Sequence, residues 1–185
     1  MAAAEIGKVV DQVFRLVYVA RNVAHHRSLE PFKDDFEQNY WILAFNNFLD
    51  IAVLEWCKAF GSKSEATHWS KHVKDPDAFR AGLFHRLAVS EDEWRTYWES
   101  IKNYRDEVVA HHESASKVTH YPDFGHALKA CFYYYEILIR ELRVLHVFDY
   151  PDNLEDYFER SLAQAKNFSE IAYRATRSLK ENVYY

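Results

Sequence analysis

The chain has 185 residues, a formal net charge of −5, 49% hydrophobic residues, four glycines and four prolines. This length allows one domain with a single sizeable core, and the negative charge excludes a strongly basic surface that attracts nucleic acid from a distance. The scarcity of turn-forming residues argues against a β-rich domain and favours long helices.

The first helix is expected over residues 5–27, where apolar residues recur every three or four positions. A second helix is expected over residues 34–60, with Asp34 or Asp35 as its N-cap and Gly61 at its end. Because apolar residues surround the second helix on nearly all sides, we predict that it is central in the fold.

Residues 61–90 predict loops and short helices, one of which starts at Pro76 with Asp75 as its cap. Ser90 is followed three residues later by Glu93. This pair is a capping-box pattern that predicts the start of the next helix.

The helix that starts at Ser90 is expected to run to about His111, and Pro122 marks the restart of helical structure. Further helices are expected over residues 123–147 and 153–179. We therefore predict a single all-α domain over residues 1–185, with its core at roughly 5–173. Its expected architecture is an up-and-down bundle of four long helices plus one or two short helices.

The two cysteines, Cys57 and Cys131, lie in apolar stretches and are expected to be buried free thiols of a reducing compartment. Charges between residues 5 and 11 interrupt any signal-peptide core, and polar residues between 46 and 50 interrupt the most apolar run. A cytoplasmic protein without membrane association is therefore predicted.

The stretch "YRDEVVAHHES", residues 104–114, combines an arginine, an acid and two histidines. Arginine can bind a phosphate through two parallel hydrogen bonds, and histidine can transfer a proton near neutral pH. RNA carries its own nucleophile, the 2′-hydroxyl, so such a site needs no metal. On an ideal helix Arg105 lies beside the apolar stripe and His112 almost above it, whereas His111 reaches the same groove only if the helix bends or ends at Ala110.

The spacing of Arg105, Asp106 and the two histidines resembles the signature of the HEPN superfamily (higher eukaryotes and prokaryotes nucleotide-binding domains). "NNFLDIAVLEWCKAFGS", a following "HW" and a later "YPD" resemble its abortive-infection branch, and the resemblance covers roughly residues 35–145. It implies a helical dimer with arginines and histidines of both subunits in one cleft.

Members of that superfamily are often metal-independent endoribonucleases without a cofactor, and many are toxins or phage-defence proteins paired with an antitoxin; others are inactive binding or scaffold modules. By the resemblance, Arg105 and His111 are catalytic and Asp106 is the polar residue after the arginine, with His112 as the other candidate histidine. Lys102 and Tyr104, on the same helix, are expected to contact RNA.

Other groupings offer alternatives. Arg21 and His26 in "ARNVAHHRS" have the same loose spacing, but they are also typical of a solvated helix end, as the 104–114 stretch could be. His68 and His72 have the i, i+4 spacing of metal ligands on a helix, with no "HExxH" pattern to support it, so no metal site is predicted. The aromatic run of residues 131–145 could stack on bases, although such rings are more often part of the core.

Overall fold

The computed structural model describes residues 3–109 and 122–180, and every regular element within these ranges is helical. The all-α class predicted from the sequence is therefore confirmed for this part of the chain. The α-helices are α1 (Ala3–Leu29), α2 (Asn39–Phe60), α3 (Pro76–Leu87), α4 (Glu91–Tyr104), α5 (Gly125–Val144) and α6 (Leu154–Thr176). Two 3₁₀ helices, η1 (Glu30–Asp35) and η2 (Trp69–Lys71), and one π-helical turn, η3 (Arg105–Val109), complete the elements.

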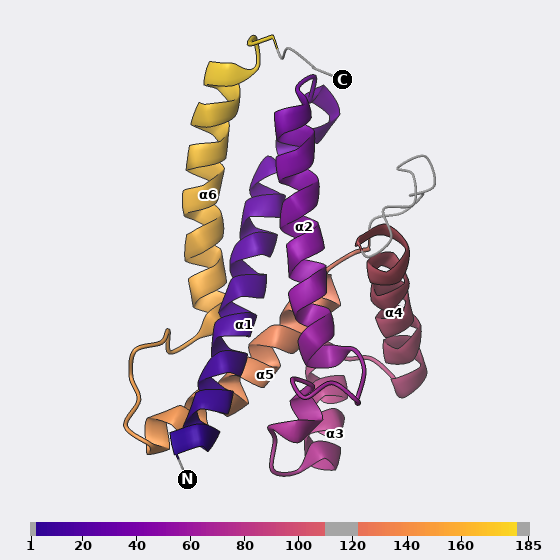
Figure 1. Ribbon diagram of the computed structural model, residues 1–185, viewed down its shortest axis with the longest axis vertical. Helices are drawn as coiled ribbons and strands as arrows, with labels where there is room; N and C mark the ends of the chain where they lie inside the picture. The colour runs from indigo at the N-terminus through magenta and orange to yellow at the C-terminus, as the bar shows by residue number, and fades with distance from the viewer. Residues whose placement is uncertain (1–2, 110–121, 181–185) are drawn as a thin grey trace.

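Helix α1 holds the central position. It packs against α2, α5 and α6, and Figure 1 shows it between α6 and α2, with α5 crossing behind them. Its residues Val13, Leu16 and Ala20 have no exposed surface. The prediction that the helix of residues 34–60 is central is wrong, because one face of α2 carries exposed apolar side chains such as Leu43 (58% exposed).

The start of α2 also differs from the expectation. Residues Glu30–Asp35 form the separate helix η1, so Asp34 and Asp35 are not the cap of α2. The N-cap is Gln38, whose side chain donates no capping bond and instead donates to the carbonyl oxygens of Arg177 and Leu179. The N-cap side chain of α2 thus makes a tertiary contact with the residues that follow α6 in place of a capping bond.

The local start and stop signals agree with the sequence. Asp75 directly precedes Pro76, and its side chain accepts hydrogen bonds from the amides of residues 77 and 78 in the first turn of α3. Ser90 and Glu93 form the reciprocal capping box at the start of α4. Gly61 ends α2 and donates its amide to the Cys57 carbonyl at 2.8 Å.

The core is built largely from the inner faces of α1, α2 and α5. On α5 the rings of Tyr134 and Tyr135 are fully buried, which supports the core interpretation of the aromatic run over base stacking. Cys57 and Cys131 are both buried free thiols, as predicted. No helix in the described ranges is long and apolar enough to cross a membrane.

Hydrogen bonds connect α4, which precedes residues 110–121, to the start of α5, which follows them. The Tyr97 hydroxyl on α4 donates to the Asp123 carbonyl at 2.8 Å and accepts from the Ala127 amide at 2.8 Å. These bonds hold the first turn of α5 against α4, so the end of α4 that carries Arg105 has a defined place beside α2 (Figure 1).

Candidate functional site

Arg105 is the first residue of the π-helical turn η3, directly after α4 ends at Tyr104. Its side chain is 27% exposed and its guanidinium contacts the Asp106 carboxylate. The Nε and Nη2 atoms lie 2.8 and 2.6 Å from the same Asp106 oxygen. The acid therefore fixes the plane of the guanidinium, which is the geometry expected of an orienting residue.

Tyr104 anchors this turn to α2. The tyrosine is 5% exposed, and its hydroxyl donates to Asp50 Oδ1 at 2.7 Å. A ring buried in this way offers no open face for stacking on a base. The structure therefore gives Tyr104 a supporting position next to Arg105, and its contact with RNA stays a prediction of the sequence.

Lys102 lies one turn before Arg105 on α4. It is half-buried, and its ammonium lies 5.3 Å from the centre of the Trp98 ring. The Trp98 indole N–H in turn donates to the Phe60 carbonyl at the end of α2. Lys102 and Arg105 thus supply two cations along the side of α4 that faces α2.

Both cations act on the pKa of the Cys57 thiol. Burial raises the pKa of Cys57 to about 11, while Arg105 and Lys102 act in the opposite direction and Asp106 adds to the rise. These fields show that Arg105, Lys102 and Asp106 lie around the same stretch of α2. The raised pKa also keeps Cys57 a neutral, unreactive thiol at pH 7.

His111 and His112 lie outside the described residues, so their distances to Arg105 are not part of this geometry. Of the predicted catalytic group, the structure brings Arg105 and Asp106 together, and the role of the histidines stays a prediction of the sequence. His120, which precedes the start of α5, also lies outside the described ranges.

The competing motif on α1 is packed rather than open. The His26 ring stacks on Phe45 at 4.0 Å, and its Nδ1 lies 3.0 Å from the Phe45 carbonyl oxygen. Burial lowers the pKa of His26, which the hydrogen bond to the Phe45 carbonyl and then the Glu30 carboxylate partly offset. Arg21 is exposed, and its five-residue separation from His26 on α1 places the two side chains about 140° apart around the helix, which does not favour a shared phosphate site.

The two histidines of the metal alternative do not share a helical face, because the intervening helix η2 has only three residues. His68 Nδ1 accepts from the Ser70 amide at 3.2 Å, and His72 Nε2 lies 3.0 Å from the Ala66 carbonyl oxygen. Within the described part of the chain no three histidine, cysteine or acidic side chains gather as a metal site.

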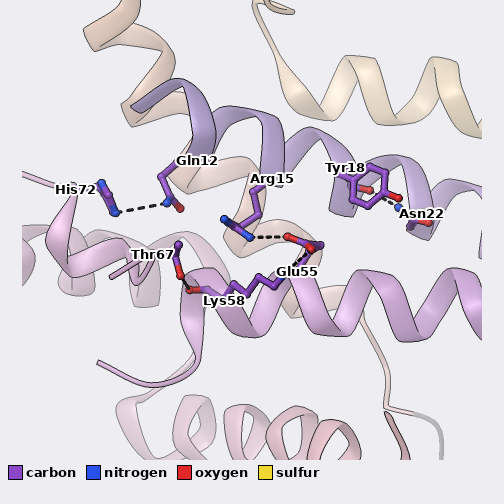
Figure 2. A network of polar contacts seen from close by, with 8 residues as sticks. All are labelled: Gln12, Arg15, Tyr18, Asn22, Glu55, Lys58, Thr67 and His72. Carbon is purple, nitrogen blue, oxygen red and sulfur yellow. Dashed lines mark hydrogen bonds and ion pairs between the residues drawn. The ribbon is translucent and has the colours of Figure 1, made fainter. Parts of the chain in front are cut away.

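A polar network between α1 and α2 was missed by the sequence analysis (Figure 2). Arg15 Nη1 and Lys58 Nζ each lie 2.5 Å from an oxygen of Glu55, and the Gln12 amide nitrogen lies 3.4 Å from His72 Nε2. The available signal was Gln12 itself, because it interrupts the buried stripe of α1 between Val9 and Leu16.

No protein-family model, curated protein or solved structure matches this chain.

Proposed function

We propose that the protein is a metal-independent endoribonuclease of the HEPN type, in which Arg105 binds the scissile phosphate. The supporting observation is the position of Arg105: it is half-exposed, oriented by Asp106 and placed on a π-helical turn beside α2. Single π turns associated with α-helices, most of them bulges within a helix, occur frequently at functional sites. Lys102, one helical turn earlier, adds a second positive charge for the RNA backbone.

The reaction that suits this site is an internal transesterification. The RNA 2′-oxygen attacks the adjacent phosphorus, and the bond from phosphorus to the 5′-oxygen breaks. The 2′-hydroxyl proton passes to a base, and the leaving 5′-oxygen receives a proton, so the products are a 2′,3′-cyclic phosphate and a 5′-hydroxyl. His111 or His112 is proposed for the proton transfer.

Arg105 can contribute while it is paired with Asp106. The pair uses Nε and one side of Nη2, and a guanidinium has five N–H donors, so the Nη1 edge is the part suited to a phosphate. Negative charge increases on the phosphoryl oxygens in the transition state, and a fixed cation stabilises it. Asp106 keeps that cation from rotating away.

A homodimer is part of the proposal, because the resemblance predicts a cleft shared by two subunits. On α2 the side chains of Tyr40, Leu43 and Leu54 are 65%, 58% and 36% exposed, and their spacing places them along one side of the helix. An exposed apolar stripe of this kind suits a subunit contact. The bundle of four long helices, RNA as substrate, the antitoxin and the cytoplasmic location belong to the same proposal.

A catalytically inactive binding or scaffold module is the second candidate. The ion pair of Arg105 with Asp106 favours it to the extent that the acid neutralises the cation, in a chain whose net charge is −5. In that role the pair would stabilise the end of α4 without contacting a substrate.

The deciding experiment incubates purified protein with single-stranded RNA in excess EDTA. Arg105→Ala and His111→Ala are expected to lose cleavage, and His112→Ala shows whether the neighbouring histidine takes part. Arg95→Ala is the matched control, because Arg95 is an exposed arginine of α4 that pairs with Asp92. Its activity should equal that of the wild type.

Products that end in a 2′,3′-cyclic phosphate identify the proposed reaction. Cleavage by all variants alike would indicate a contaminating nuclease and remove the enzymatic proposal. RNA binding without cleavage by the wild type would favour the inactive module. Growth arrest on expression, relieved by Arg105→Ala, would support a toxin.

A further inference from the structure

A second polar site lies away from the end of α4, between α1, α2 and the loop that precedes α3. It is a cavity of about 540 Å³, within the usual size range of small-molecule sites. Lys8, Gln12 and Arg15 of α1 line one side, and Lys71 and His72 line the other. Figure 2 shows Gln12 and Arg15 pointing from α1 toward the His72 segment and α2.

The side chain of Gln12 is buried in this cavity without full pairing. The residue is 1% exposed, and its Oε1 has no hydrogen-bond partner among the described residues. His72 Nε2 is 3.0 Å from the Ala66 carbonyl, so it donates there and cannot also accept from Gln12. Whichever way the amide is turned, one of its polar ends is left unpaired, which costs about 1–3 kcal/mol unless a ligand pairs with it.

Arg15 repeats the pattern. Its side chain is 14% exposed and its Nη1 contacts Glu55, but its Nε has no partner in the described part of the chain. Two buried polar groups on successive turns of one helix are thus unpaired within the described part of the chain. Both belong to side chains that line the same cavity.

The charges around the cavity favour an anion. Three basic side chains line it: Lys8, Arg15 and Lys71. Two acids also line it, Asp11 and Glu55, and Glu55 is already paired with Arg15 and Lys58. Burial lowers the pKa of His72, and the fields of Lys8 and Arg15 lower it further. Because Arg15 and Glu55 form an ion pair, the lysines Lys8 and Lys71 leave an excess of positive charge over Asp11 at this point of a protein that is negative as a whole.

Two aromatic rings border the opening. Phe14 and Tyr18 line the cavity and are 61% and 45% exposed. They are four residues apart on α1 and so lie one above the other on the same side of the helix. A ligand with a flat or apolar part can cover them, while its charged end reaches the lysines.

We propose that this cavity binds a small organic anion. Its phosphate or carboxylate group contacts Lys8, Lys71 and the Gln12 amide, and its ring or apolar part lies against Phe14 and Tyr18. The proposal does not depend on ribonuclease activity, since none of these residues belongs to the end of α4.

Isothermal titration with three probes tests it: phenyl phosphate, benzoate and the neutral benzyl alcohol. At least one anion is expected to bind with a stoichiometry of one, and benzyl alcohol is expected not to bind. The stronger of the two anions identifies the preferred charged group. Lys71→Ala should weaken binding about tenfold, equivalent to about 1.4 kcal/mol.

Lys8→Ala and Gln12→Met should weaken binding as well. The matched control is Lys166→Ala, which removes an exposed lysine of α6 that does not line the cavity. The lysine variants lie at the surface, so they test the site even if Gln12→Met fails to fold. Absence of saturable binding by both anions, equal binding of benzyl alcohol, or wild-type affinity in both lysine variants would overturn the proposal.

Discussion

Lowering the pH from 7 to 5 should destabilise the protein by about 2 kcal/mol through His68 alone. His68 is 3% exposed, and its Nδ1 accepts the Ser70 amide at the start of η2. Burial, and then the positive charges of Lys63 and Lys71, lower the pKa of His68 from 6.5 to about 4. The imidazole is therefore neutral in the folded protein at pH 5.

In the unfolded chain the same imidazole keeps its ordinary pKa near 6.5 and is mostly protonated at pH 5. The unfolded state then binds more protons than the folded state, so stability falls as the pH falls below about 6.5. Evaluated between pH 7 and 5, the linkage amounts to about 2 kcal/mol, and it would still be about 1.5 kcal/mol if the folded pKa were nearer 5.

The assay is urea unfolding of the wild type and of His68→Asn at pH 7, 6 and 5. Asparagine retains a short side-chain acceptor for the Ser70 amide but does not titrate. His25 and His26 also have pKa values lowered by burial, and their contributions cancel in the comparison; His72 acts on His68 electrostatically, so its change is part of the measured difference. If both proteins lose the same stability between pH 7 and 5, the burial argument for His68 is wrong.

Two further predictions concern packing around α2. Tyr104→Phe removes the hydroxyl that donates to Asp50, and we expect a loss of about 0.5–1.5 kcal/mol, the net contribution of a typical hydrogen bond; the unfolding free energy measures it, and an unchanged value would show that the bond contributes nothing. Gly61→Ala should cost about 1–3 kcal/mol, since a Cβ there would lie 2.3 Å from the Cys57 carbonyl oxygen. Gly7→Ala is its matched control: a Cβ at Gly7 meets nothing within 4 Å, so this change within α1 should stabilise the helix by about 0.5–1 kcal/mol, and a similar loss in both variants would contradict the clash.

The candidate site illustrates how far an ideal-helix extrapolation reaches. Helical periodicity predicts Arg105 beside the buried stripe, and its 27% exposure next to α2 agrees with that placement. The predicted directions of His111 and His112 assume about 100° per residue beyond Arg105, as in an ideal α-helix. Residues Arg105–Val109 instead form a π turn. A π turn rotates less per residue than an α-helix, so the angles calculated beyond Arg105 do not apply.

The missed network at Gln12, Arg15 and Glu55 has a different cause. Each of these residues is an ordinary helix-forming residue, and no short motif contains them all. They meet because α1 and α2 run antiparallel, which brings residue 15 beside residue 55. In the sequence, the one signal is a polar residue, Gln12, within an otherwise apolar stripe of α1, which indicates a buried polar contact.

By itself the sequence determined the helical class and most helix ends, because capping depends on a few neighbouring residues. The Ser90–Glu93 box, the Asp75 cap and Gly61 are all bonds between residues at most four positions apart. The tertiary structure decided that α1 rather than α2 is central, that Gln38 starts α2 against the end of α6, and that Arg15 meets Glu55. These outcomes depend on which helices pack against each other. An apolar periodicity predicts that a helix face is buried, but it does not identify the helix that packs against that face.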